Sequence, residues 1–266
     1  MNGARSKPNY GAAVRLVAVL ACGLGPSMAW SPWAQAAGNV QASVANGDLI
    51  ISGDSRNNNI IVIQEFAAGQ VRVIGRAGTT VNGERGIFAE GVTNDIDIAM
   101  RGGDDFVRVE VIPGANPIPG DLRINTGRQD DVVELLGVTV SAETQINTGS
   151  GNDIIFIDGV FSHTEAFVRS DFTGRFAVEA GDEEDLLEMN HATFRGEVDV
   201  NLGNGIDAAC SHASEFQDLD NTSFDGGAPH AFPGDGFYEL VIDLADAIVD
   251  FEEFPDDCAF LGGRVF

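Results

Sequence analysis

The sequence is short of basic residues, and of lysine above all. Its 266 residues include 15 lysines and arginines against 41 aspartates and glutamates, for a formal net charge of −26. The single lysine is Lys7, so the rest of the chain lacks the lysine that a phosphate-binding loop requires. Such an acidic chain repels nucleic acid and anionic lipid. We expect it to attract divalent cations or to function at high salt, where self-repulsion is screened.

Long apolar runs are missing beyond the first 36 residues. A transmembrane helix needs roughly 18 consecutive apolar residues, and no later segment supplies them. Residues 1–36 instead have the pattern of a secretory signal, with a basic start, an apolar run and a cleavage site. These parts are Arg5, Lys7 and Arg15, then residues 16–24, then Ala34-Gln35-Ala36, with Ser27-Met28-Ala29 as a second cleavage site.

The pattern predicts a chain that is secreted or held at the cell surface. Lipidation at Cys22 is disfavoured, because Arg15 leaves only a short apolar run before that cysteine. Loss of the signal removes three basic residues and no acidic ones, so the exported chain is still more acidic.

Cysteine is scarce as well. Without the signal, Cys210 and Cys258 remain. In an exported chain we expect them to form one disulfide, which would fix the C-terminal tail to the rest of the chain. Two free thiols are the alternative, and they suit an oxidising environment less well.

Familiar catalytic motifs are also absent. The four histidines form no H-E-x-x-H zinc pair, and no G-x-S-x-G nucleophile turn occurs. The sequence therefore predicts no catalytic residues and a protein that is not an enzyme.

The sequence does contain a repeat. Five segments align on the template apolar-x-apolar-x-x-G-x-x-x-D, followed by a short apolar strand. They are residues 96–109, 122–135, 144–157, 176–189 and 198–211, and their closing aspartates are Asp105, Asp131, Asp153, Asp185 and Asp207. These aspartates are 26, 22, 32 and 22 residues apart. A weaker copy at residues 55–63 has Asn59 in the aspartate position.

Each copy has two strands in which apolar residues alternate, and a third short strand follows, as at residues 138–140. Three short strands in about 22 residues make one turn of a parallel β-helix, in which equivalent positions stack about 4.8 Å apart. We therefore predict an all-β, right-handed parallel β-helix of five to six coils. The two longer spacings then contain insertions of 4 and 10 residues, at residues 113–120 and about 162–174.

The predicted register places opposite charges side by side. Asp97 falls beside Arg123 of the next coil, and Arg108 falls beside Glu134. Opposite charges are favoured at adjacent positions on paired strands, so both pairs support the register.

Both ends of such a coil need caps. Residues 40–45 and 48–52, joined by Asn46-Gly47, predict a β-hairpin at the N-terminal side. A helical spacing of apolar residues at 238–251 lies near the other end. The predicted organisation is a signal at 1–36, an N-terminal β cap with the first coil at 37–92, repeats at 93–211 and an irregular acidic C-terminal cap at 212–266.

Residues 149–153 (GSGND) and 203–207 (GNGID) resemble the haemolysin-type (RTX) calcium-binding repeat, G-G-x-G-x-D-x-U-x. Residues 48–211 resemble exported bacterial β-helix proteins with such corners. The resemblance implies calcium, bound by glycine carbonyls and by the aspartates Asp105, Asp131, Asp153, Asp185 and Asp207. Two features depart from that family: there is one motif per coil rather than a tandem array, and Gln129 and Glu183 replace the middle glycine.

A structural role for these aspartates is the alternative. Carboxylates stacked about 4.8 Å apart repel by roughly 3–4 kcal/mol at an effective dielectric near 20, and calcium between coils would relieve that repulsion. Otherwise each aspartate accepts hydrogen bonds from amides of its own corner, as in an Asx-turn. We favour the structural role, and the sequence leaves both open.

Together these patterns predict an exported, acidic, non-catalytic protein with a structural, adhesive or surface-interaction role. Extracellular polysaccharide and surface proteins are the expected partners, and nucleic acid is not. The alternative is a polysaccharide lyase, because β-helices host such enzymes, which pair a calcium-binding carboxylate cluster with a basic residue. Arg101, Arg123 and Arg128 would supply that residue, although fold analogy alone does not make a site.

Overall fold

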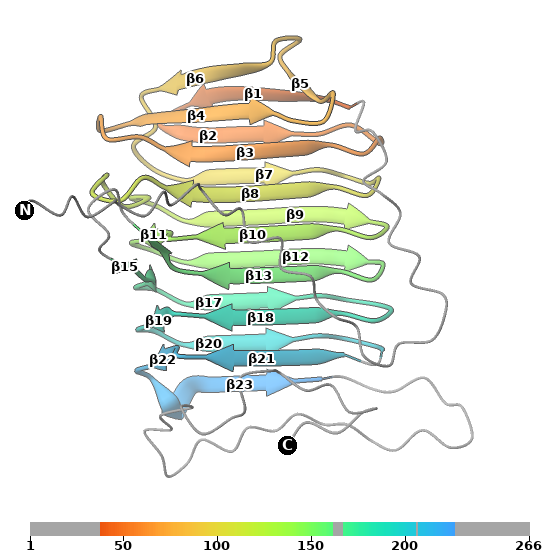
Figure 1. Ribbon diagram of the computed structural model, residues 1–266, viewed down its shortest axis with the longest axis vertical. Helices are drawn as coiled ribbons and strands as arrows, with labels where there is room; N and C mark the ends of the chain where they lie inside the picture. Colours follow the sequence, from red (N-terminus) through yellow and green to blue (C-terminus); the bar gives the residue numbers. More distant parts are fainter. Residues whose placement is uncertain (1–37, 162–166, 206, 227–266) are drawn as a thin grey trace, which may run out of the picture.

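The computed structural model describes residues 38–161, 167–205 and 207–226 (Figure 1). These residues form strands and turns, with one short 3-10 helix, η1 (Leu219–Asn221), and no α-helix. In this part of the chain no helix is long and apolar enough to cross a membrane. The predicted signal, Cys258 and the helical pattern at 238–251 lie outside the described residues.

The largest sheet has nine strands in the order β23-β20-β17-β12-β9-β7-β2-β1-β5. From β2 to β23 all neighbours are parallel, because the chain returns to the same end of the sheet before each new strand. The strands are β1 (Asn39–Ala45), β2 (Asp48–Ser52), β5 (Thr80–Val81), β7 (Ile96–Ala99), β9 (Leu122–Arg128), β12 (Thr144–Ser150), β17 (Phe176–Glu179), β20 (Val198–Asn201) and β23 (Thr222–Asp225).

A second sheet of eight strands runs beside it along the long axis (Figure 1), in the order β21-β18-β13-β10-β8-β3-β4-β6. It is parallel from β3 to β21 and antiparallel at the N-terminal end, where β4 pairs with β3 and β6. The strands are β3 (Asn59–Gln64), β4 (Gln70–Gly75), β6 (Gly86–Glu90), β8 (Phe106–Val111), β10 (Val132–Leu136), β13 (Ile154–Asp158), β18 (Leu186–Asn190) and β21 (Ala208–His212).

A third, parallel sheet has four short strands in chain order. They are β11 (Thr139–Val140), β16 (Ser170–Phe172), β19 (Ala192–Phe194) and β22 (Glu215–Phe216). An all-β chain whose three sheets are parallel throughout the repeats is compatible with the predicted β-helix.

The predicted register is confirmed. Asp97 pairs with Arg123 between β7 and β9, and Arg108 pairs with Glu134 between β8 and β10. Apolar residues at alternate positions face the interior, where they stack on the equivalent residues of the neighbouring repeats and form one continuous core. Burial of this alternate set opposes any one-residue slip, which would turn the whole set outward.

The predicted hairpin is also confirmed, with β1 and β2 paired antiparallel. Asn46 and Gly47 have φ of 54° and 94°. Positive φ at both central residues is the requirement of a type I′ turn, which Asn-Gly meets best.

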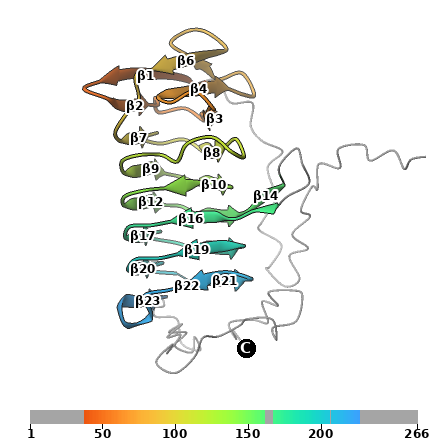
Figure 2. The ribbon, with the colours of Figure 1, turned by 90° about the vertical axis from the view of Figure 1, so that its left-hand side faces the viewer.

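Two details of the predicted repeats were wrong, one residue assignment and one insertion boundary. The weaker copy carries Asn58, not Asn59, in the aspartate position, because Asn59 pairs with Phe106, the residue after Asp105. The second insertion ends before Ser170, since β16 belongs to the third sheet. The inserted part holds the antiparallel strands β14 (Val160–Phe161) and β15 (Phe167–Val168), and β14 points away from the stacked sheets in Figure 2.

Regular pairing also continues beyond residue 211, where an irregular cap was expected. β22 and β23 add parallel strands to β19 and β20. The reason is aromatic packing: Phe216 stacks on Phe194 with ring centroids 5.0 Å apart, and Phe224 packs edge-on against Phe216 at 5.8 Å. Further apolar surface therefore joins the core after the last recognisable repeat.

Candidate functional site: a buried aspartate ladder

The closing aspartates of the repeats lie in one column at the turn into the eight-stranded sheet. Each directly precedes a strand of that sheet, and the structure brings all of them together as predicted. The exposed fractions of Asp105, Asp131, Asp153 and Asp185 are only 2%, 0%, 1% and 4%. We call the column Asn58, Asp105, Asp131, Asp153, Asp185 and Asp207 the inner ladder.

Hydrogen bonds in the inner ladder run between repeats. The Oδ1 atom of each aspartate accepts the backbone N–H of the preceding member of the column. The N···O distances, from Asn58 N to Asp105 Oδ1 onward, are 2.6, 2.7, 2.8, 2.9 and 3.0 Å. The sequence predicted an Asx-turn within one corner, whereas these bonds tie neighbouring corners to each other.

The second carboxyl oxygen has a different environment. Within the described residues, Oδ2 of all five ladder aspartates is buried without a hydrogen-bond partner. Burial penalises the ionised form, and the neighbouring carboxylates add to that effect. Burial is the main cause that raises the pKa of Asp131 and Asp185 to about 8, of Asp105 to about 7, and of Asp153 and Asp207 to about 6.

Two buried threonines lie beside the inner ladder. The Thr126 hydroxyl donates to the carbonyl oxygen of Thr148 at 3.2 Å, and the Thr148 hydroxyl donates to that of Ala180 at 3.1 Å. Thr126 also lies close enough to interact with the Asp131 carboxyl, and Thr148 with that of Asp153. Both hydroxyls therefore link repeats alongside the carboxylates.

A second ladder begins at the other end of the repeats, just before the strands of the nine-stranded sheet. Here Asp48 Oδ1 accepts the Asp95 amide at 3.3 Å, Asp95 Oδ1 accepts the Asp121 amide at 2.9 Å, and Asp121 Oδ1 accepts the Glu143 amide at 2.9 Å. We call Asp48, Asp95 and Asp121 the edge ladder. It repeats the amide contacts of the inner ladder at a partly exposed position.

The edge ladder differs because Arg123 pairs with the second oxygens of Asp95 and Asp121. Arg123 Nη1 lies 2.8 Å from Asp95 Oδ2 and 3.1 Å from Asp97 Oδ1, and its Nη2 contacts Asp121. The hydrogen bond from Arg123 is the main reason that the pKa of Asp95 is held below its usual value. Among the described residues, the edge ladder thus contacts an arginine side chain and the inner ladder contacts no cation.

Sequence reasoning missed the edge ladder, although a signal was present. The residue directly before the first strand of every repeat is charged: Asp95, Asp121, Glu143, Arg175 and Glu197. Arg175 is the exception in sign, and it contacts Glu143 at 3.1 Å, Glu197 at 3.3 Å and Asp199 at 2.6 Å. The edge column is therefore built on arginines that each bridge several acids.

Replacing Arg123 with glutamine should lower the free energy of unfolding by about 1 kcal/mol at low ionic strength, because three half-exposed contacts are lost. Urea unfolding at low and high salt measures the change, which should shrink as salt screens the charges. Arg195→Gln, which removes pairing with Asp171 alone, is the matched control. Equal losses in both variants would show that bridging several acids adds no stability.

The inner ladder leaves few oxygens free for calcium, and calcium binding stays a prediction. Calcium takes six to eight oxygen ligands. Here one oxygen of each aspartate accepts an amide, and the carboxylates stack one per repeat rather than converging on a point. Across residues 38–161, 167–205 and 207–226, no group of three or more His, Cys, Asp or Glu side chains is placed to hold a metal ion. The contacts fit coil-to-coil hydrogen bonding instead.

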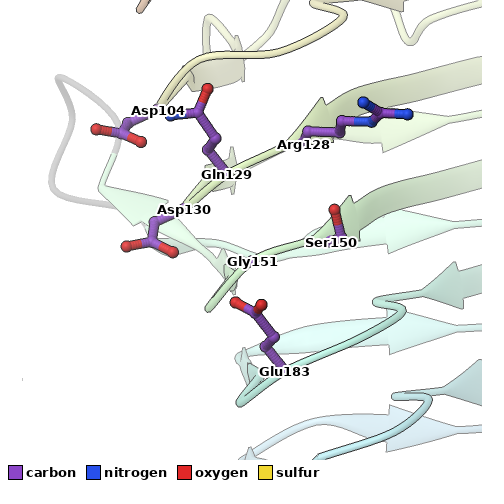
Figure 3. Close-up of a pocket in the computed structure, with 7 residues that line it drawn as sticks. All are labelled: Asp104, Arg128, Gln129, Asp130, Ser150, Gly151 and Glu183. Atoms are coloured by element: carbon purple, nitrogen blue, oxygen red, sulfur yellow. The ribbon is translucent and has the colours of Figure 1, made fainter.

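The outer surface of the same corners carries an open hollow of about 410 Å³ (Figure 3). It is lined by Asp104, Arg128, Gln129, Asp130, Ser150, Gly151 and Glu183. Arg128 is the only one of the three arginines of the lyase alternative among these lining residues. Arg123 lies at the start of β9, engaged in the edge ladder, while Arg128 lies at the end of that strand. The hollow therefore does not gather the predicted basic set.

Cys210 lies on β21, paired with Glu188 of β18. Its predicted partner, Cys258, lies outside the described residues, so the disulfide stays a prediction. Comparisons with protein-family models, with curated proteins and with solved structures find no match to this chain.

Proposed function

We propose that this chain is an exported, non-catalytic protein with a structural or adhesive role, built as a right-handed parallel β-helix of about 22 residues per coil. The proposal rests on the hydrogen bonds that the repeated aspartates accept. Each accepts a backbone amide of the neighbouring repeat, at N···O distances of 2.6–3.0 Å. The most regular polar residues of the chain thus serve stacking rather than an open site.

The adhesive part of the proposal rests on the outer corners. Asp104, Asp130, Glu183 and Glu184 lie exposed beside the inner ladder and give this edge of the molecule a negative surface. Such a surface favours partners with basic groups, or polysaccharides held through shared cations. Extracellular polysaccharide and surface proteins are the partner classes we propose.

Export and the absence of catalysis are tested separately. Residues 1–36 fused to a phosphatase that is active only outside the cytoplasm should give active reporter, and a reporter retained inside the cell would contradict export. Purified residues 37–266, incubated with a panel of acidic polysaccharides, should release no unsaturated product detectable by ultraviolet absorbance. Product that disappears in Arg128→Ala but persists in Arg85→Ala would instead establish the lyase.

A further inference from the structure

We propose that the inner ladder binds protons rather than calcium. Asp131 and Asp185 carry a proton on Oδ2 in the folded protein near neutral pH, and the other ladder aspartates gain one in mild acid, so acid strengthens the stacking of the repeats and base weakens it. The inference concerns the described residues alone and does not depend on the proposed function.

The two ladders differ in what surrounds the second carboxyl oxygen. In both, Oδ1 accepts an amide of a neighbouring repeat. In the edge ladder the second oxygens of Asp95 and Asp121 meet Arg123. In the inner ladder the second oxygen is buried and no described group donates a hydrogen bond to it. A buried carboxylate without a donor or a cation is costly, and binding a proton removes its charge.

Two buried threonines offset the cost of ionisation only in part. The Thr126 and Thr148 hydroxyls donate to carbonyl oxygens of the next repeat at 3.2 and 3.1 Å. Their contacts with the Asp131 and Asp153 carboxyls lower the pKa of those groups, but burial raises it by more.

The inner ladder already contains a neutral member. Asn58 occupies its first position, and both its backbone N–H and its Nδ2 donate to Asp105 Oδ1, at 2.6 and 3.1 Å. Asn58 Nδ2 also donates to the carbonyl oxygen of Arg56 at 2.6 Å. An uncharged side chain, with Nδ2 donating and Oδ1 buried without a partner among the described residues, thus occupies this column.

The surrounding charges act in the same direction. The groups that act on the ladder carboxyls from the adjoining corners are themselves acids: Asp54, Asp104, Asp130, Glu183 and Glu184. With folded-state pKa values of about 6 to 8 against about 3.9 in the unfolded chain, the folded state holds more protons between these values. The free energy of unfolding must then fall as pH rises from about 4 to about 8.

Thermal unfolding of the 37–266 chain between pH 5 and 9, at constant ionic strength, tests this. The melting temperature should fall by at least about 10 °C across that range. Asp131→Asn, which mimics the protonated acid, should flatten the fall and melt at or above the unsubstituted protein at pH 9. Asp121→Asn is the matched control from the edge ladder, where ionisation is needed for the Arg123 contact, and it should melt lower throughout. The other titrating groups, including the partly buried Glu110, whose pKa burial raises, are shared by all three proteins and cancel in the comparison.

Infrared spectroscopy of the unsubstituted protein provides a readout that does not depend on a variant folding. At pH 7 the carbonyl stretch of protonated carboxylic acid should be present, and it should weaken in Asp131→Asn. The proposal is overturned if that band is absent at pH 7, or if Asp131→Asn lowers the melting temperature at pH 9 as much as Asp121→Asn does. A saturable rise in melting temperature with calcium over chelator, lost in Asp131→Asn, would also overturn it.

Discussion

Replacing Gly149 with alanine should lower the free energy of unfolding by about 2–5 kcal/mol. Gly149 has φ of 96°, a region that costs an L-residue about 1–2 kcal/mol. A Cβ atom there would also lie 2.0 Å from the carbonyl oxygen of Gly127 in the preceding repeat. Because a backbone atom cannot move aside as a flexible side chain can, the two repeats would have to separate, at a further cost of about 1–3 kcal/mol.

The control for this substitution is Gly83→Ala. Gly83 has a similar φ of 82°, but a Cβ atom at that position meets nothing within 4 Å. Gly83→Ala should therefore lower the free energy of unfolding only by the conformational cost, about 1–2 kcal/mol. Urea unfolding of both variants separates backbone conformation from the clash between repeats. Equal losses would mean that the stacked glycines matter only for their φ angles.

Phe194→Ala should lower the free energy of unfolding by a comparable amount, about 3–5 kcal/mol. Phe194 is 1% exposed and packs against three other rings. The ring centroids of Phe172, Phe176 and Phe216 lie 5.2, 4.8 and 5.0 Å away. Removing the central ring leaves a cavity that neighbouring β-strands, held in register by their hydrogen bonds, cannot close.

Phe161→Ala provides the comparison for that loss. Phe161 is 71% exposed at the end of β14 and contacts Phe167 edge-on, so its removal should cost well under 1 kcal/mol. Both variants are measured by thermal and urea unfolding. If Phe194→Ala were as mild as Phe161→Ala, the stacked rings of Phe172, Phe194 and Phe216 would not be part of the rigid core. The continuation of pairing into β22 and β23 would then need another explanation.

Much of the architecture was predictable because it depends on alternation and spacing. The period of two in each copy identified the strands, and the 22-residue spacing of Asp131 and Asp153 identified which residues pair. The hairpin followed from Asn46-Gly47, whose conformational preference is local. The error at the first copy has a local cause too: Asn57, Asn58 and Asn59 are identical neighbours, so no residue type marks the one that faces inward.

The extent of the stacked sheets was less predictable. No closing aspartate follows β22 and β23 at the template spacing, where Ala231 stands, so the template did not find them. They are held by Phe216 and Phe224, which complete an aromatic column begun by Phe172 and Phe194 far earlier in the chain. Contacts of that range have no signature in a local pattern.

The two acidic ladders separate most clearly what the sequence determined from what the tertiary structure decided. The sequence by itself determined that aspartates recur at one position of each repeat, and hence that they stack. Only the tertiary structure decided what each carboxylate meets. Arg123 reaches Asp95 and Asp121 at the edge, whereas the second oxygen of Asp131 is enclosed where no described group donates to it. The reason is that the amides, cations and solvent around a carboxyl come from neighbouring repeats 22 to 32 residues away, so its charge state follows from the packed structure.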